Sequence, residues 1–198
     1  MARPRQTSDE EILDAARSCF LEHGPSVSTA TIAAKLGVSQ AALFKRFGTK
    51  KELMLSALLP GSPEWLTAVE RGPDPDREIP SQLLDIARAA AAYFARLTPC
   101  MATLRASKID FREAMARYDV PPPLRARAAM TAWFTAAQEQ CRMGPVHPEE
   151  AALLFLGSMH MRCFLGHMTQ TAQPSDPARL ERMVDALWSG LTPPLETP

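Results

Sequence analysis

The 198-residue sequence predicts an all-α protein. Three observations support this fold class: capping residues recur before apolar runs, apolar residues recur three and four positions apart, and no long alternation of apolar and polar residues indicates a strand. Prolines mark many boundaries between the apolar runs. Helices are therefore expected at about 8–23, 29–36, 40–47, 50–59, 63–71, 81–97, 99–106, 109–118, 122–143, 148–169 and 177–191.

The first predicted helix begins at a capping box. Ser8 and Glu11 are spaced as the two partners of such a box, and Gly24 can end the helix. The apolar residues between them share one helix face, which we expect to be buried: Ile12, Ala15, Ala16, Cys19 and Phe20.

Residues 28–53 have the order of a helix-turn-helix motif. Ser28 can cap a short helix, Gly37 can end it in the left-handed conformation, and Ser39 can cap the helix that follows. Val38 can fill the corner between the two helices. Such a motif is a common way to bring side chains into the DNA major groove.

The second helix of this motif has an apolar face and a free face. Leu43 and Phe47 lie four positions apart and are expected to pack back on the preceding helix. The opposite face carries Gln40, Ala41, Phe44 and Lys45. Thr49 with Glu52 predicts a further capping box, which opens the next helix.

Positive charge is concentrated in the same stretch. The chain as a whole carries 22 basic and 22 acidic residues, so its formal charge is zero. From position 35 to 51 the stretch contains no acidic residue, and its basic residues are Lys35, Lys45, Arg46, Lys50 and Lys51. A local basic face suits DNA phosphates. The alternative is a set of ordinary solvated surface charges.

Proline pairs punctuate the rest of the chain. Ser62-Pro63, Thr98-Pro99 and Asp176-Pro177 each look like a capping residue followed by the first residue of a helix. Five prolines fall within residues 60–80. This segment is expected to separate an N-terminal unit from a larger helical body, with the helix near residue 50 linking the two.

Residues 8–53 resemble the TetR family of bacterial transcriptional regulators. The resemblance rests on a fixed order of short motifs: Phe20, Gly24, Ile32-Ala33, Gly37-Val38-Ser39, Leu43-Phe44-Lys45-Arg46-Phe47 and Lys50-Lys51-Glu52-Leu53. The chain departs from the family pattern at Phe44, where Tyr is usual, at Arg46, where Tyr or His is usual, and at Thr31, where an acidic residue is usual. The family's phosphate contacts therefore cannot be transferred unchanged.

The resemblance implies a helix-turn-helix DNA-binding domain over residues 1–53 and a helical effector-binding and dimerisation domain over residues 54–198. Double-stranded DNA with a palindromic operator is the expected partner. Lysine and arginine side chains would bind phosphates, Gln40 would read adenine, and Ala41 would contact a thymine methyl group. The expected DNA-binding residues are Ser28, Thr29, Ser39, Gln40, Ala41, Phe44, Lys45, Arg46 and Lys50.

The middle of the chain is rich in methionine and aromatic residues, and in relatives this region encloses a small-molecule pocket. A small hydrophobic or aromatic effector is expected to suit such a lining. The alternative for each of these residues is an ordinary place in the core. The candidate effector-binding residues are Met101, Leu104, Arg105, Phe111, Met130, Trp133, Phe134, His160 and Phe164.

The helix expected at 148–169 is apolar nearly all round, so it must be covered on both sides. In the family, two C-terminal helices of each subunit form a four-helix dimer interface, and a homodimer is expected here; the alternative is two core helices of a monomer. The candidate interface residues are Phe155, Met159, Cys163, Leu180, Met183, Val184 and Leu187.

Other functional classes have little support in the sequence. No apolar run approaches the ~20 residues that span a bilayer, and no secretory signal is present, so a cytoplasmic protein is expected. The four cysteines are interpreted as small buried residues. His160, Cys163 and His167 share a helix, but their spacing is too long for one metal ion.

A repressor without catalytic activity, cofactor or metal is therefore the prediction. The alternatives are an architectural DNA-binding protein without an effector, and a helical enzyme or carrier that has kept the fold. No nucleophile motif or glycine-rich phosphate loop supports an enzyme.

Overall fold

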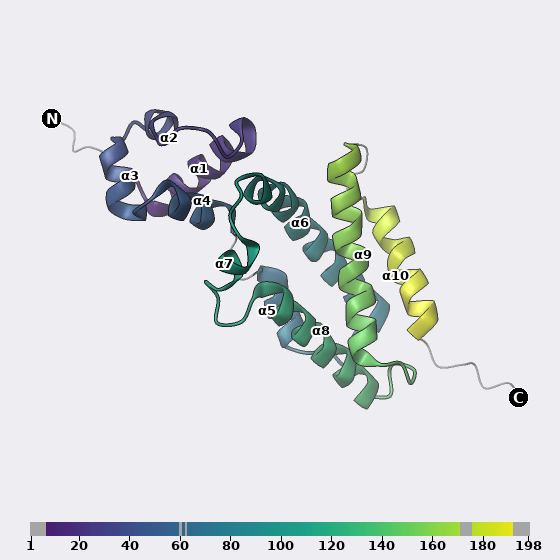
Figure 1. The fold of residues 1–198 in the computed structure, drawn as a ribbon. Coiled ribbons are helices and arrows are strands. Elements are labelled where there is room, and N and C mark those ends of the chain that lie inside the picture. The colour runs from purple at the N-terminus through teal and green to yellow at the C-terminus, as the bar shows by residue number, and fades with distance from the viewer. Residues whose placement is uncertain (1–6, 60, 62, 171–175, 192–198) are drawn as a thin grey trace, which may run out of the picture. The chain divides into compact units, whose positions relative to one another are not determined.

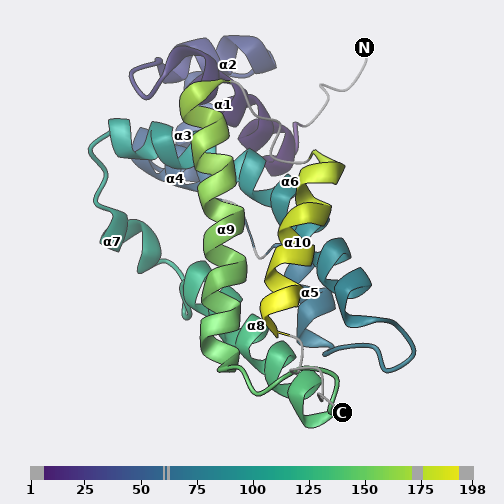
Figure 2. The same cartoon turned by 90° about the vertical axis from the view of Figure 1, so that its right-hand side faces the viewer.

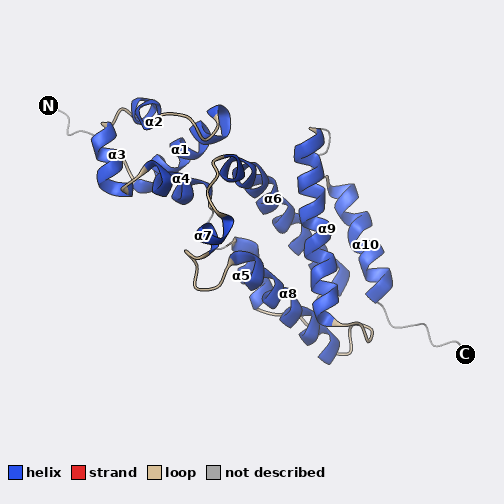
Figure 3. Cartoon of the chain, viewed as in Figure 1, coloured by secondary structure: helices blue, strands red, loops and turns tan. Residues whose placement is uncertain are grey.

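In the computed structural model, residues 7–59, 61, 63–170 and 176–191 are described, and every regular element among them is a helix (Figure 3). The all-α prediction is confirmed. Figure 1 labels the helices: α1 Asp9–His23, α2 Thr29–Leu36, α3 Gln40–Phe47, α4 Lys50–Leu58, α5 Glu64–Glu70, α6 Ile79–Ala106, α7 Phe111–Met115, α8 Pro122–Glu139, α9 Pro148–Thr169 and α10 Pro177–Leu191.

The chain divides into two compact units. The first unit comprises Met1–Gly61 and Pro99–Arg117, and the second comprises Ser62–Thr98 and Tyr118–Pro198. The expected division after residue 53 differs from this arrangement in two ways. All of α4 belongs to the first unit, and so do the last part of α6 and all of α7, although they follow α4 by about forty residues or more in the sequence.

The core of the first unit explains why it includes these distant segments. Helices α1 to α4 bury Phe20, Ile32, Leu43 and Leu55 almost completely. Cys100 and Leu104 of α6 and Ala114 of α7 lie in the same buried cluster. Residues 99–117 therefore supply part of the apolar cover that the short N-terminal helices need.

The helix-turn-helix corner forms as its sequence predicts. The hydroxyl groups of Ser28 and Ser39 accept hydrogen bonds from the backbone N–H groups of Thr31 and Ala42. Gly37 ends α2 in the left-handed conformation, with φ 65° and ψ 27°. Its backbone N–H donates hydrogen bonds to the carbonyl oxygens of Ala33 and Ala34 in the last turn of the helix. The two short helices are thus fixed by local backbone chemistry.

The prediction of two helices at 81–97 and 99–106 is wrong, because α6 continues through Pro99. Thr98 does not act as a capping residue. Its hydroxyl donates to the Phe94 carbonyl, and the Thr103 hydroxyl donates to the Pro99 carbonyl. A proline inside a helix costs one backbone hydrogen bond, and the packing of the flanking turns in two buried clusters holds the helix together.

Two further helix boundaries differ from the prediction. Helix α8 ends at Glu139, four residues early, and Cys141 follows in the left-handed region with φ 57°. Pro63 stands at the start of α5 without a side-chain cap, while Ser62 lies outside the described residues. The predicted cap at Asp176 is confirmed, because its carboxylate accepts from the Ala178 N–H.

The second unit has its own core, formed by α5, the first part of α6, α8, α9 and α10. Helix α5 packs on α8, and α8 packs on α9. Figure 1 and Figure 2 both show α9 and α10 side by side, and the Ser158 hydroxyl of α9 meets the Met183 sulfur of α10 at 3.2 Å. The largest fully buried side chains here are Trp133, Phe134 and Phe155.

Replacement of Gly37 by alanine tests the helix-turn-helix corner. Alanine is strained at a φ of 65°, so Gly37→Ala should lower the free energy of unfolding by about 1 kcal/mol. Chemical denaturation measures the change. Gly37→Asn is the matched control, because asparagine tolerates the left-handed region; it should cost less than alanine. Equal losses in the two variants would contradict this explanation of the turn.

Candidate nucleic-acid interface

Helix α3 presents the face that the sequence predicts. Leu43 is buried and Phe47 is half-buried against the core of the first unit. The other side of the helix, from Gln40 through Ala41 and Phe44 to Lys45, is exposed. Phe44 is a large apolar side chain with 39% of its surface accessible. An exposed helix face of this kind, held by a rigid corner, can enter the major groove.

Gln40 and Thr29 form a direct link between α2 and α3. The Gln40 side-chain amide donates to the Thr29 hydroxyl at 2.5 Å, and Thr29 is one of the few buried polar residues. Thr29 therefore orients Gln40 from within the motif instead of facing outward itself. The amide group has a second N–H and a carbonyl oxygen, and these can still pair with adenine.

The positive charge of the stretch 35–51 is partly neutralised by residues from elsewhere in the chain. Arg46 of α3 pairs with the Asp9 carboxylate at 3.2 Å and donates to the Thr7 carbonyl. Lys51 of α4 pairs with Glu113 at 2.6 Å. Both acidic partners lie outside the stretch. The sequence reasoning missed these pairs because it counted charges along the chain and not in space.

Three lysines of the stretch form no ion pair among the residues that the structure describes. Lys35 donates to the Ser18 hydroxyl, which carries no charge. Lys45 and Lys50 have no ion pair within 4 Å in the described part of the chain. Lys45 is exposed on α3, and Lys50 opens α4. The unneutralised charge of the motif is therefore concentrated at these three positions.

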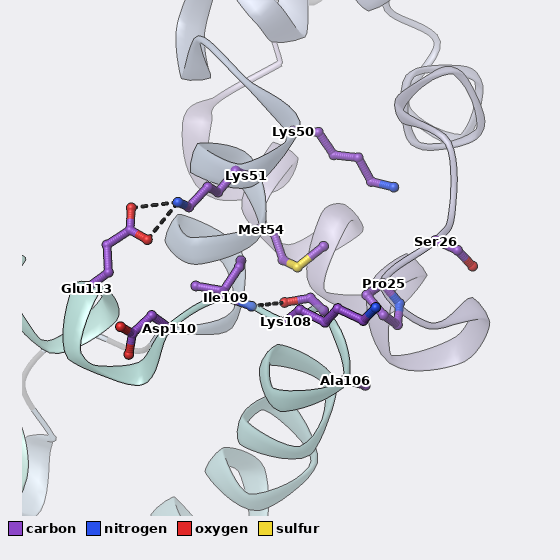
Figure 4. A pocket seen from close by; sticks show the side chains of 11 residues that line it. Pro25, Ser26, Lys50, Lys51, Met54, Ala106, Lys108, Ile109, Asp110 and Glu113 are labelled. Carbon is purple, nitrogen blue, oxygen red and sulfur yellow. Dashed lines mark hydrogen bonds and ion pairs between the residues drawn. The ribbon is translucent and has the colours of Figure 1, made fainter.

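An open depression lies beside the start of α4, within the first unit (Figure 4). Its wall includes Lys50, Lys51, Lys108 and Glu113. Figure 4 shows Lys51 directed toward Glu113, whereas Lys50 is directed away from that pair. The neighbouring lysines thus have different electrostatic surroundings although they are adjacent in the sequence.

A second ion pair on α4 replaces half of a predicted capping box. The Thr49 hydroxyl accepts from the Glu52 N–H, as predicted. The Glu52 carboxylate, however, pairs with Arg117. Together with the pair between Lys51 and Glu113, this contact ties the first turn of α4 to α7 and to Arg117, two residues after the end of α7. Residues 111–117 therefore help to position the segment that carries Lys50.

The candidate effector-binding residues do not gather at one site. Met101, Leu104, Arg105 and Phe111 belong to the first unit, where Leu104 is buried in the core and Phe111 is 55% exposed. The others belong to the second unit. Met130, Trp133 and Phe134 are fully buried in its core, whereas His160 and Phe164 are exposed. The prediction placed these nine residues at one site, but they belong to two different units of the chain.

Among the described residues of the second unit, two buried side-chain polar atoms have no hydrogen-bond partner. They are the indole Nε1 of Trp65 and the guanidinium Nε of Arg162. Trp65 lies in the same core cluster as Met130 and Trp133. An unpaired buried donor is costly, so these atoms are places where a bound molecule with an acceptor oxygen would be favoured. The sequence contains no signal that would have identified them.

The predicted dimer residues mostly face the interior of their own chain. Phe155, Met159, Cys163, Leu180 and Val184 are at most 2% exposed, while Met183 and Leu187 are half-buried. The five buried side chains have little surface to offer to a second chain, whereas Met183 and Leu187 stay predictions. The exposed apolar side chains of α9 are instead Leu153, Leu154, Met161, Phe164, Leu165 and Met168. We call them the outer face of α9.

The cysteines and histidines offer no reactive cluster. Cys19, Cys100 and Cys163 are buried, but Cys141 is exposed, contrary to the prediction. Burial raises the pKa of the Cys100 thiol, with Arg17 opposing the change, and burial likewise raises the pKa of the Cys163 thiol against the effect of Arg162.

Cys163 also lies apart from its two neighbouring histidines on α9. It is buried, whereas His160 and His167 are exposed, so the three side chains do not share one surface. In the described part of the chain, no three His, Cys, Asp or Glu side chains are grouped to hold a metal ion. Of the described helices, none combines the length and apolarity that crossing a bilayer requires.

Comparison with solved structures shows the same fold in several regulators. The chain superposes on the FadR regulator of Bacillus subtilis in complex with stearoyl-CoA with a TM-score of 0.72, at 16% identity, over 92% of this chain and 99% of that one. The SmeT repressor of the Stenotrophomonas maltophilia multidrug efflux pump superposes with a TM-score of 0.67 at 19% identity, over 94% of this chain and 91% of that one. A TetR-family regulator of Pseudomonas syringae superposes with a TM-score of 0.63 at 20% identity, over 96% of this chain and 100% of that one.

The N-terminal helices also match a family model. Residues 12–57 match the model of the bacterial regulatory proteins of the tetR family. A search of curated proteins finds no match. The matched residues include the whole of the helix-turn-helix corner and the exposed face of α3. Residues 12–57 therefore carry the N-terminal helices typical of the tetR family, and the fold of the whole chain is similar to that of solved TetR-family regulators.

Proposed function

We propose that the protein is a homodimeric, cytoplasmic repressor that binds a palindromic DNA operator and releases it when a small apolar effector binds. The observation that carries this proposal is the exposed face of α3 beside the unpaired Lys45 and Lys50. A helix face bordered by unpaired lysines can enter the major groove while the lysines bind phosphates. No catalytic activity, cofactor or metal is part of the proposal.

The proposed DNA contacts are divided between base reading and phosphate binding. Gln40 reads adenine with its remaining N–H and its carbonyl oxygen, and Ala41 contacts a thymine methyl group. Lys45 and Lys50 bind phosphates, together with free backbone N–H groups in the first turns of α2 and α3. Arg46 is not part of this phosphate set, because its guanidinium is occupied by Asp9 and Thr7.

The proposed dimer forms through the outer face of α9. Leu154, Met161, Leu165 and Met168 follow one another at spacings of seven, four and three, so they share one stripe of the helix. Each of the four is at least 51% exposed. A contiguous exposed apolar stripe is unfavourable in water, and a second copy of the chain would cover it. Two copies would also present two α3 helices to two half-sites.

The proposed effector binds in the second unit. FadR of Bacillus subtilis was solved with stearoyl-CoA and SmeT of Stenotrophomonas maltophilia with triclosan, and each ligand combines a large apolar part with oxygen atoms. An apolar effector with an acceptor oxygen would suit the core around Met130 and Trp133 and could accept from Trp65. The effector would bind more tightly to a dimer conformation in which the two α3 helices are not spaced to fit both half-sites of the operator. Effector binding then increases the population of that conformation, and DNA is released.

The neighbouring lysines of α4 give a matched test of the DNA contacts. Lys50→Ala should weaken binding to every DNA sequence by roughly tenfold and reduce the salt dependence by about one released counterion per protomer. Lys51→Ala removes the same charge from a residue already paired with Glu113, and should change both quantities much less. Fluorescence anisotropy with DNA from the protein's own promoter, at several salt concentrations, measures both. Equal effects of the two variants would contradict the proposed role of Lys50.

The outer face of α9 can be tested with a pair of equally exposed leucines. Leu165 and Leu124 are each 51% exposed, but only Leu165 lies on α9. Leu165→Glu would bury a charge in the proposed interface, so the species should shift from a dimer to the 21.7 kDa monomer and operator affinity should fall. Leu124→Glu should leave the mass unchanged. Analytical ultracentrifugation measures the masses. If the protein without substitutions is itself a monomer, the proposed dimer is refuted.

Effector binding can be tested with the two ligands of the similar proteins. Stearoyl-CoA or triclosan, or a related apolar compound with an acceptor oxygen, should raise the melting temperature and weaken DNA binding together. Trp65→Phe removes the unpaired N–H together with part of the buried indole ring, so it should lower the melting temperature without ligand and weaken ligand binding by roughly three- to tenfold. DNA binding that no such compound changes would favour the alternative, an architectural DNA-binding protein without an effector.

A further inference from the structure

The first residues of α2 and α3 contact each other across the helix-turn-helix corner. The side-chain amide of Gln40, which begins α3, donates to the hydroxyl of Thr29, which begins α2, at 2.5 Å. Thr29 is 5% exposed and is one of two buried polar residues in the described part of the chain, whereas Gln40 is exposed. The contact therefore joins an interior hydroxyl to the side chain that is proposed to read a base.

Both ends of this contact are fixed by the local fold. Ser28 caps the first turn of α2 just before Thr29, and Ser39 caps the first turn of α3 just before Gln40. The two helices also pack on each other. Because both helix starts are held in place and Thr29 is buried, its hydroxyl is a fixed hydrogen-bond acceptor beside the exposed amide.

We propose that Thr29 is a specificity-determining residue, which occupies one N–H of the Gln40 amide and thereby makes Gln40 select adenine and reject guanine in the operator. The inference rests on the proposed DNA-binding function and deepens it, because it explains which base is excluded and by which residue. Thr29 has a positioning role in this arrangement, since it acts through Gln40.

The hydrogen-bonding groups that remain on Gln40 match adenine. A side-chain amide has two N–H donors and one carbonyl acceptor. The Thr29 hydroxyl takes one N–H, so one donor and one acceptor are left for a base. In the major groove, adenine presents the N7 acceptor next to the N6 amino donor, and it can pair with both remaining groups.

Guanine does not match the same groups. Its major-groove edge presents two acceptors, N7 and O6. While Thr29 holds one N–H of Gln40, the carbonyl oxygen of the amide would face one of these acceptors without a proton between them. Without the Thr29 hydroxyl the amide regains its second N–H and can turn to offer only donors. The contact with Thr29 therefore keeps the adenine pairing and removes a possible guanine pairing.

The neighbouring side chains of α3 do not replace this selection. Arginine and lysine are the common readers of guanine. Ala41 and Phe44 are uncharged, Arg46 is already paired with a carboxylate, and Lys45 is assigned to a phosphate. The choice between adenine and guanine at this point of the half-site therefore depends on Gln40 and on the residue that holds it.

The base that Gln40 reads can be located by selection from DNA with randomised half-sites. Sites selected by the protein and by Gln40→Ala should differ at one position of each half-site, where only the protein without substitutions selects adenine. Probes with adenine or guanine at this position then give a ratio of dissociation constants by fluorescence anisotropy. The ratio should favour adenine by at least about tenfold. Identical selected sites, or a preference for guanine, would overturn the proposal.

Thr29→Val tests the positioning role. Valine has nearly the shape of threonine but no hydroxyl, so the ratio should fall to about threefold or less as guanine binding improves. Thr29→Ser keeps the hydroxyl and should restore most of the ratio. Thr31→Val is the matched control, because the Thr31 hydroxyl lies on the same helix but meets Ser28 at 2.8 Å; this variant should keep the ratio.

The ratio also separates positioning from support of the fold. If Thr29 only stabilised α2, then Thr29→Val would weaken binding to both probes by the same factor, and the unchanged ratio would overturn the proposal. Melting temperatures of all variants verify that the fold is kept. Failure of the protein without substitutions to bind any DNA would refute the proposed function itself, whereas selective binding with a ratio that Thr29→Val leaves unchanged would refute only this inference.

A modified base distinguishes major-groove reading from an effect of DNA shape. 2,6-Diaminopurine has the major-groove edge of adenine together with the minor-groove amino group of guanine. A probe with this base at the Gln40 position should therefore bind like the adenine probe. Binding like the guanine probe would show that the minor groove decides the preference, and would overturn the assignment to Gln40 and Thr29.

Discussion

The burial of one apolar face by a distant segment is the constraint on which the DNA-binding unit depends. Helices α1 to α4 are 8 to 15 residues long, and helices of this length have little stability without tertiary packing. Residues 99–117 complete their core through Cys100, Leu104 and Ala114. The corner that orients α3 is therefore supported by residues far away in the sequence.

The same segment also determines the electrostatics of the motif. Glu113 neutralises Lys51 and Arg117 binds Glu52, so the first turn of α4 carries one unneutralised lysine, Lys50, among its described side chains. These surface pairs contribute little to stability. Their consequence is spatial: they decide which of two adjacent lysines remains available to a phosphate. Asp9 has a similar effect on Arg46.

The two faces of α9 show how one apolar helix can have two roles. Its inner face holds Phe155 and Met159 in the core of the second unit, and the outer face leaves Leu154 and Leu165 exposed. The sequence of α9 is apolar nearly all round because one side of the helix is buried in the core and the other side carries exposed apolar residues. The interior side chains belong to folding, and the outer face is what a partner could cover.

The sequence by itself determined the all-α class, the caps at Ser28 and Ser39, and the turn at Gly37, because each of these depends on neighbouring residues and local backbone geometry. The sequence also identified the exposed face of α3, through the helical spacing of the apolar residues on its opposite face. Only the tertiary structure decided that α6 continues through Pro99, which side of α9 is buried, and which charges are paired. Those features depend on contacts between residues far apart in the chain, and spacing along a sequence does not contain that information.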